Sequence, residues 1–220
     1  MKTALVTGDL GFIGQHLVTA LRNQEGYHVL GLDLKRGPHE DIRTCEFPEI
    51  DVDVCFHLAA QTNAQTKNAY EDANTNIMGT LRILDKYRDR VVFAASATEP
   101  LVPYSISKFA CEHYCRLYGA RMVRMCNVTG PGGHGVFEAF AKADVLKIAG
   151  KGDQKRVYAP VSQAVSAFID VANTAPGFVY NLPGLELTVV DIANLFYPAK
   201  QRYFVEQDAN DRAVVLRTRL

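Results

Sequence analysis

The sequence predicts an α/β fold in which a doubly wound parallel sheet is covered by helices. Two observations lead to this prediction. Short apolar runs alternate with longer segments of helical periodicity, and the first run is followed at once by glycines at the spacing of a strand-to-helix turn. The expected strands are 3–7, 28–33, 52–58, 91–95 and 122–127, and the expected helices are 11–23, 69–88 and 104–119.

The turn after the first strand has three glycines spaced as Gly-x-x-Gly-x-x-Gly. Gly8 permits a tight turn, Gly11 lets the backbone approach a pyrophosphate, and Gly14 lets the helix pack closely on the strand. The helix N-terminus presents free N–H groups and a partial positive charge to such a phosphate. We therefore expect the segment 8–14, with Phe12 and Ile13 inside it, to bind a dinucleotide.

The second apolar run ends in Asp33, at the distance from the glycines where an acid meets the adenosine ribose. A carboxylate there accepts hydrogen bonds from both ribose hydroxyls and repels a 2′-phosphate. NAD is therefore favoured over NADP, although Lys35 and Arg36 keep NADP open.

Tyr104 and Lys108 are spaced to lie one turn apart on a helix face. A fixed ammonium stabilises a phenolate, and a positively charged nicotinamide stabilises it further. The pair therefore predicts an acid/base catalyst, with Tyr104 acting as a base near neutral pH.

Composition narrows the functional classes. The 24 basic and 24 acidic residues balance, so no overall field attracts nucleic acid or a membrane surface. No apolar run is long enough to span a bilayer, and Met1 and Lys2 lead directly into a strand, so we expect a cytoplasmic protein. The five cysteines form no Cys-x-x-Cys pair and have no histidine at ligand spacing, so no metal site is expected.

A glycine-rich hinge at 129–135 divides the chain. We expect an NAD-binding domain at 1–128 and a reduced substrate-binding lobe at 129–220, with helices at 136–148 and 162–173 and a strand at 177–182. Some elements of the lobe are expected to pack back on the first sheet.

With these motifs in order, the chain resembles the extended short-chain dehydrogenase/reductase family, the NAD-dependent nucleotide-sugar epimerases and dehydratases with a Rossmann-type domain. The resemblance covers residues 1–184. Besides the glycine turn and Tyr104 with Lys108, it rests on four further segments: Asp41 with Ile42, 57–60, Asn76 with Gly79 and Thr80, and 127–132.

The resemblance implies roles for these residues. Asp41 and Ile42 would contact adenine, while Leu58, Ala59, Ala60 and Asn76 would form the rest of the cofactor shell. Ser96 takes the position of the hydroxyl that binds the reacting sugar oxygen, and Thr98, Asn127 and Arg156 would bind the substrate. His57 is expected to be structural. The resemblance also implies a homodimer built from the helices 69–88 and 104–119.

The residues after Ser96 separate the reactions of this family. A 4,6-dehydratase carries an Asp-Glu pair there, whereas this chain has Ala97 and Thr98, with Glu99 displaced by one position. The pattern resembles the UDP-hexose 4-epimerases, so we expect a 4-epimerase of a UDP-hexose or similar nucleotide-diphosphate sugar. The alternatives are an NAD(P)H-dependent 4-keto-sugar reductase and a non-catalytic NAD-sensing protein.

The sequence departs from the pattern of this family in two places that concern substrate binding. Only seven residues, 97–103, separate Ser96 from Tyr104, so a loop that covers the sugar in the family is missing. The carboxyl end is also short, and Arg202, Asp211 and Arg212 are the possible remnants of a second phosphate-binding set.

Overall fold

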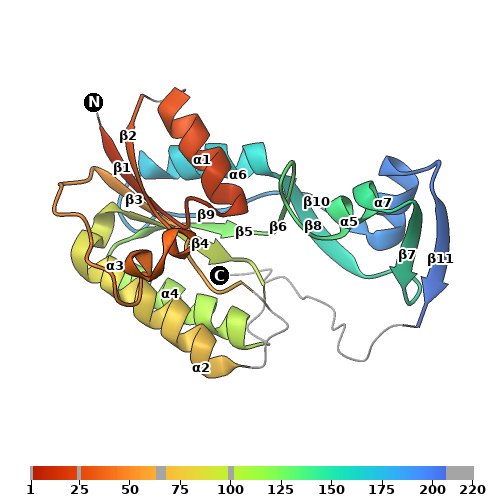
Figure 1. Ribbon diagram of the computed structural model, residues 1–220, viewed down its shortest axis with the longest axis horizontal. Helices are drawn as coiled ribbons and strands as arrows, with labels where there is room; N and C mark the ends of the chain where they lie inside the picture. The colour runs from red at the N-terminus through yellow and green to blue at the C-terminus, as the bar shows by residue number, and fades with distance from the viewer. Residues whose placement is uncertain (1, 24–25, 63–67, 99–101, 207–220) are drawn as a thin grey trace.

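The computed structural model describes residues 2–23, 26–62, 68–98 and 102–206. Its larger part is built on a six-stranded sheet with the order β2-β1-β3-β4-β5-β9 (Figure 1). Every neighbouring pair in this sheet is parallel, which confirms the predicted fold class. The strands are β1 Thr3–Thr7, β2 His28–Leu32, β3 Val54–His57, β4 Val91–Ser96, β5 Arg121–Met125 and β9 Val179–Asn181.

Helices cover both faces of this sheet, and the alternation of side chains along β1 shows why. Ala4 and Val6 belong to one apolar cluster and Leu5 to another, because successive strand residues point to opposite faces. The first face packs against α1 Phe12–Asn23 and α6 Val161–Ala172; the second packs against α3 Gly79–Tyr87 and α4 Pro103–Leu117.

The expected helix 69–88 is divided in the structure. It begins as α2 Ala69–Asp72, widens into a π-helical turn at Ala73–Met78, and continues as α3. Such π turns are frequent at functional sites. The turn contains Asn76, whose side chain is bound to the backbone of a neighbouring loop.

The rest of the chain forms a smaller lobe at the right of Figure 1. It has a three-stranded sheet, β10-β8-β6, and a two-stranded parallel sheet, β11-β7, around an apolar cluster that includes Phe140, Leu146 and Ile192. Its elements are β6 Asn127–Thr129, α5 Val136–Lys142, β7 Val145–Ala149, β8 Lys155–Pro160, β10 Leu185–Thr188, α7 Val189–Phe196 and β11 Gln201–Val205.

The prediction of a single helix at 136–148 is wrong in its second half. Helix α5 ends at Lys142, and Val145–Ala149 is strand β7. Leu146 and Ile148 are buried while Val145 and Lys147 are exposed, which is the period of two of a strand. The helical pattern of 136–142 extends into the next apolar residues when the segment is treated as one helix, so the change to a period of two is easily missed.

Two elements that follow the hinge return to the first sheet. Strand β9 pairs with β5, and helix α6 packs beside α1 with Phe168 fully buried. In the described parts of the chain, no helix is long and apolar enough to cross a membrane.

Candidate active site

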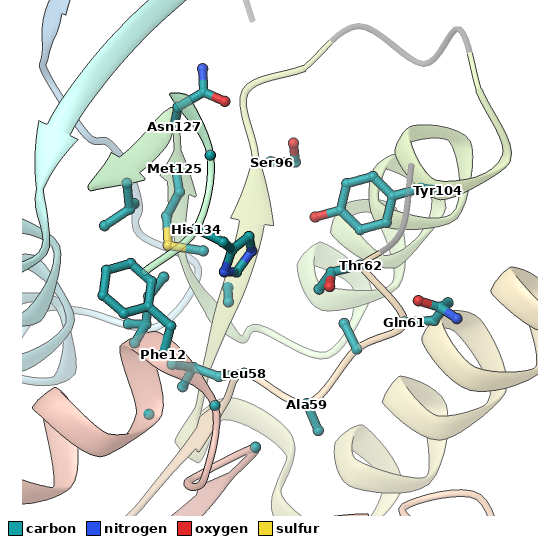
Figure 2. A pocket seen from close by; sticks show the side chains of 18 of the residues that line it. Phe12, Leu58, Ala59, Gln61, Thr62, Ser96, Tyr104, Met125, Asn127 and His134 are labelled. Carbon is teal, nitrogen blue, oxygen red and sulfur yellow. The ribbon is translucent and has the colours of Figure 1, made fainter. Parts of the chain in front are cut away.

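The carboxyl ends of the parallel strands open into a cleft of about 1910 Å³, which residues of the smaller lobe also line. Pockets for one small ligand usually measure about 300 to 1,000 Å³. This cleft therefore has room for more than one. Figure 2 shows residues of both parts facing the same space, with Phe12 and Leu58 at one end and Asn127 at the other.

The glycine turn forms the floor of the cleft. Gly8 has a φ of +74°, and a Cβ there would lie 2.7 Å from the Ala59 nitrogen. A Cβ on Gly14 would overlap the Gly8 oxygen, so the helix starts directly against the turn. A side chain would fill this cradle, and its bare backbone suits the approach of a pyrophosphate. All five predicted residues, Gly8, Gly11, Phe12, Ile13 and Gly14, line the cleft.

Asp33 lies at the rim of the cleft, just after β2, and is buried. Its Oδ2 accepts a hydrogen bond of 3.0 Å from the Leu10 N–H, and its Oδ1 accepts one of 2.9 Å from the Lys35 N–H. These two backbone donors fix the carboxylate beside the glycine turn.

Asp41 and Ile42 line the cleft next to Asp33. Arg43 donates hydrogen bonds to Asp41, at 2.7 Å to Oδ2, and holds the pKa of that carboxyl below its usual range. Ile42 is buried against Gly79, where a Cβ would come within 2.6 Å of its Cδ1. Both residues are therefore held in place by packing and ion pairing within the protein.

Asn76 supports the cleft from behind. Its Oδ1 accepts a hydrogen bond of 2.8 Å from the Gln61 N–H, and its Nδ2 donates to Gln61 O at 3.1 Å and to Ser107 Oγ at 2.8 Å. Leu58, Ala59 and Ala60 form the wall in front, whereas Asn76 does not line the cleft in the described part of the chain. Asn76 therefore acts on the cleft wall through the backbone of Gln61, which does line the cleft.

His57 is a fully buried link between two elements. Its Nδ1 lies 2.7 Å from Thr7 Oγ1 and its Nε2 lies 3.0 Å from Thr80 Oγ1. Burial, together with the charge of Lys108, lowers the pKa of His57 to about 3. The ring is therefore neutral at physiological pH and acts as a structural bridge, as expected.

Ser96, Tyr104 and Lys108 all line the cleft. Figure 2 shows the Tyr104 ring reaching from α4 toward the end of β4, where Ser96 lies. Ser96 is buried, and its Oγ accepts a hydrogen bond of 3.2 Å from the Thr98 N–H. Two side-chain hydroxyl groups and one ammonium group therefore line the same cleft.

The pKa of Tyr104 differs from the sequence-based expectation. Burial raises the pKa of Tyr104 to about 12, and the carboxylate of Asp72 adds to the rise. Burial also lowers the pKa of Lys108. The phenol is consequently protonated at neutral pH in this structure, so Lys108 alone does not make Tyr104 a base.

The predicted substrate residues lie on the lobe side. Thr98, Asn127 and Arg156 line the cleft. Asn127 donates from Nδ2 to Val157 O at 3.1 Å, which joins β6 to β8. Arg156 projects from β8 and donates from Nη1 to Lys155 O at 3.3 Å.

Several residues that line the cleft were missed by the sequence analysis. Lys147 comes from β7, which was read as helix, and Tyr158 from β8, which was not predicted at all. His134 lies in the glycine-rich hinge and packs edge-on against Phe12, with ring centroids 6.3 Å apart. The alternating pattern of 145–149 was the available signal for Lys147.

Other residues considered in the sequence analysis are not found at the cleft. Arg202 binds Asn194 within the smaller lobe and is not a cleft residue of the described chain. Glu99, Asp211 and Arg212 lie outside the described residues. Among those residues, no cluster of three or more histidine, cysteine or acidic side chains is arranged to hold a metal ion.

Known proteins share this architecture. A putative UDP-glucose 4-epimerase of Methanocaldococcus jannaschii is 30% identical over 246 aligned residues, which span 87% of this chain and 80% of that protein. The alignment is longer than the 220 residues of this chain, so the relative contains segments that are missing here. A dTDP-D-glucose 4,6-dehydratase of Mus musculus is 25% identical over 87% of this chain and 71% of its own length.

Among solved structures, the UDP-glucose 4-epimerase of Thermus thermophilus in complex with NAD superposes with a TM-score of 0.82. It is 25% identical, and the match covers 97% of this chain and 89% of that one. The sequence profile of one family matches residues 4–182, from β1 to the residue after β9. With the glycine cradle, the acid after β2 and this match together, the chain belongs to the NAD dependent epimerase/dehydratase family.

Proposed function

We propose that this protein is a 4-epimerase of a nucleotide-diphosphate hexose, with a UDP-hexose as the first candidate. The observation that carries the proposal is the composition of the cleft beside Tyr104. Ser96 is followed by Ala97 and Thr98, neither of which can protonate a leaving hydroxyl or remove a proton from carbon. A dehydration requires such an acid and base, whereas an epimerisation at C4 does not.

In the proposed reaction, bound NAD supplies the acceptor, and later the donor, of one hydride. Tyr104 Oη takes the proton of the sugar C4 hydroxyl, and Ser96 Oγ holds the same sugar oxygen. Lys108 would hold the nicotinamide ribose, and its charge together with that of the bound nicotinamide would favour the phenolate form of Tyr104, which becomes a phenol when it takes this proton. The 4-keto sugar then turns over, and Tyr104 returns the proton when the opposite face is reduced. No net oxidation occurs.

The substrate diphosphate is assigned to the lobe side of the cleft. Arg156 offers a guanidinium, whose paired N–H donors suit phosphate oxygens, and Lys147 adds a second cation. Asn127 at the junction would contact the sugar. With the reduced lobe at 129–220 and the NAD-binding part at 1–128, the substrate would lie between the two.

A homodimer is part of the proposal. Large apolar side chains are exposed on the surface formed by α2, the π turn and α4, and their association would remove them from water. These residues are Tyr70, Met78, Ile106, Tyr114 and Leu117.

Proton NMR tests the activity directly. The protein is incubated with NAD and UDP-, dTDP- and GDP-hexoses, and the anomeric signals are followed over hours. Interconversion of C4 epimers without net NADH supports the proposal and names the sugar. Conversion of a sugar to a 4-keto-6-deoxy product would replace the proposal with a dehydratase, and an inert panel would argue for a reductase or an NAD-sensing protein.

The matched control is Tyr104→Phe, which removes one oxygen and keeps the ring. It should reduce turnover on the order of 10²- to 10⁴-fold, while NAD binding stays intact. Unchanged turnover in this variant would overturn the role of Tyr104 and point to a contaminating activity.

A further inference from the structure

The second residue of the glycine turn is an acid, Asp9, and it is buried. Both of its oxygens accept hydrogen bonds from Arg36: Nη1 lies 3.0 Å from Oδ1, and Nη2 bonds Oδ2. The neighbouring strand leaves space for this carboxylate at Gly31, where a Cβ would overlap Asp9 Oδ2. The turn and β2 are thus both shaped around the Asp9 side chain.

Arg36 has a second acidic partner. Its Nη1 donates to Glu40 Oε2 at 2.8 Å, and the same oxygen accepts the Asp33 N–H at 2.8 Å. The guanidinium is therefore separated from the backbone of Asp33 by a single carboxylate oxygen. Two acids share one arginine, so its charge is fully compensated at this position.

The other cation beside Asp33 is also engaged. Lys35 Nζ donates to Leu10 O at 2.7 Å. Asp33, Lys35 and Glu40 line the cleft, whereas Asp9 and Arg36 are not cleft-lining residues in the described chain. Arg36, the arginine nearest to Asp33, has a side chain that is 35% exposed but is held by its two acids beside the cleft rather than in it.

This arrangement matters for one chemical difference between dinucleotides. NADP carries a 2′-phosphate on the adenosine ribose, and proteins that accept it supply an arginine there. We propose that Asp9 is a positioning residue for cofactor selectivity: by holding Arg36 out of the cleft, it prevents the protein from binding the 2′-phosphate of NADP. The proposal rests on the assignment of the adenosine ribose to Asp33.

A purely structural brace would behave differently. If the Asp9–Arg36 pair only ties the glycine turn to residues 34–36, its loss weakens NAD and NADP alike and lowers the melting temperature. If it withholds the arginine, its loss improves NADP selectively. The ratio of the two affinities separates the two roles.

The experiment measures NAD and NADP binding by isothermal titration calorimetry on protein freed of nucleotide. Asp9→Asn keeps the shape of the side chain and removes its charge; Asp9→Ala releases the guanidinium further. We expect NADP affinity to rise by about tenfold or more in these variants, as for a new arginine–phosphate contact, while NAD affinity changes by less than about threefold. The gain should shrink as salt is raised.

The matched control is the double variant Asp9→Asn with Arg36→Gln, in which the released cation is absent and the gain should vanish. Glu40→Gln frees Arg36 from its other partner and gives a second route if the Asp9 variants do not fold. NAD binding with no selective gain of NADP in any variant would overturn the inference. Failure of the wild-type protein to bind NAD would instead overturn the assignment of the cofactor site.

Discussion

The ammonium of Lys108 lies 4.2 Å from the centroid of the Phe93 ring, which belongs to the buried core. A cation over an aromatic face regains part of the energy lost when it leaves water. Burial nevertheless lowers the pKa of Lys108, so the compensation is incomplete. Burying this side chain therefore costs stability, as is common where a residue is kept for function.

Lys108→Met should therefore separate stability from activity. The methionine retains the length of the side chain and can contact Phe93 through its sulfur. We expect the free energy of unfolding to rise by about 1 kcal/mol, because a buried charge is removed, and turnover to fall on the order of 10²-fold. Urea unfolding and the NMR assay measure the two effects; a variant that is both less stable and fully active would contradict this account.

The ionisation of Tyr104 should depend on NAD. With a pKa raised to about 12, the folded protein without NAD keeps this phenol protonated throughout the neutral range. A positively charged nicotinamide beside the ring favours the phenolate and lowers the pKa. The ultraviolet difference spectrum between wild type and Tyr104→Phe isolates this tyrosine, and its phenolate signal should move to lower pH when NAD is added. A signal at pH 8 without NAD would refute the prediction.

His57 should make the protein sensitive to acid. Its pKa of about 3 in the folded state lies below the ordinary value of 6.5, so its contribution is fully present above pH 6.5 and is lost as the pH falls toward 3. Between pH 7.5 and pH 5 the loss is about 2 kcal/mol. In His57→Gln, which keeps an acceptor and a donor between Thr7 and Thr80, this part of the slope should disappear from urea unfolding measured at both pH values. If wild type and His57→Gln lose the same free energy of unfolding between pH 7.5 and pH 5, the burial argument is contradicted.

The glycine cradle provides a paired test of steric closeness. Gly8 and Gly177 have nearly the same φ, +74° and +78°, but only Gly8 has close neighbours; nothing lies within 4 Å of a Cβ on Gly177. Alanine at either position costs about 1 to 2 kcal/mol for the left-handed backbone. We expect Gly8→Ala to lose further stability and to abolish NAD binding, whereas Gly177→Ala binds NAD normally. If Gly8→Ala and Gly177→Ala lose the same stability and both bind NAD, the close neighbours of Gly8 have no effect and only the left-handed backbone matters.

The proposed homodimer depends on the exposed face of α4. Leu117 is 78% exposed there and Ile106 is 51% exposed. Light scattering at micromolar concentration should give twice the mass of one chain, and the double variant Ile106→Lys, Leu117→Lys should give a monomer with unchanged NAD affinity. A monomeric wild-type protein would contradict the proposal.

The first five strands of the larger sheet were predictable because each is a short apolar run followed by a residue with an expected role in the site. The glycine turn, Asp33, Ser96 and the Tyr104–Lys108 pair follow from local spacing, and the structure brings all of them to one cleft. The residues around Arg36 were not predictable in the same way. Its pairing with Asp9 joins positions 27 residues apart, and nothing in their spacing announces it.

The smaller lobe was less accessible to sequence reasoning for a physical reason. Its strands are short, and their pairing partners are distant: β11 pairs with β7, more than fifty residues earlier in the chain. In β7 the alternation covers only five residues, and the helical residues of α5 come immediately before it. Long-range pairing rather than local propensity therefore decided the structure there.

Helix α6 and strand β9 make the folding of the larger, NAD-binding part depend on sequence beyond the hinge. Because both come from sequence beyond the hinge and both complete the first sheet, a fragment ending at residue 128 would leave the apolar surface around Val6 and Leu17 uncovered. Synthesis of the chain must then reach β9 before the nucleotide-binding half can close its core. A truncation at the glycine-rich hinge 129–135 is therefore not expected to give a folded NAD-binding fragment.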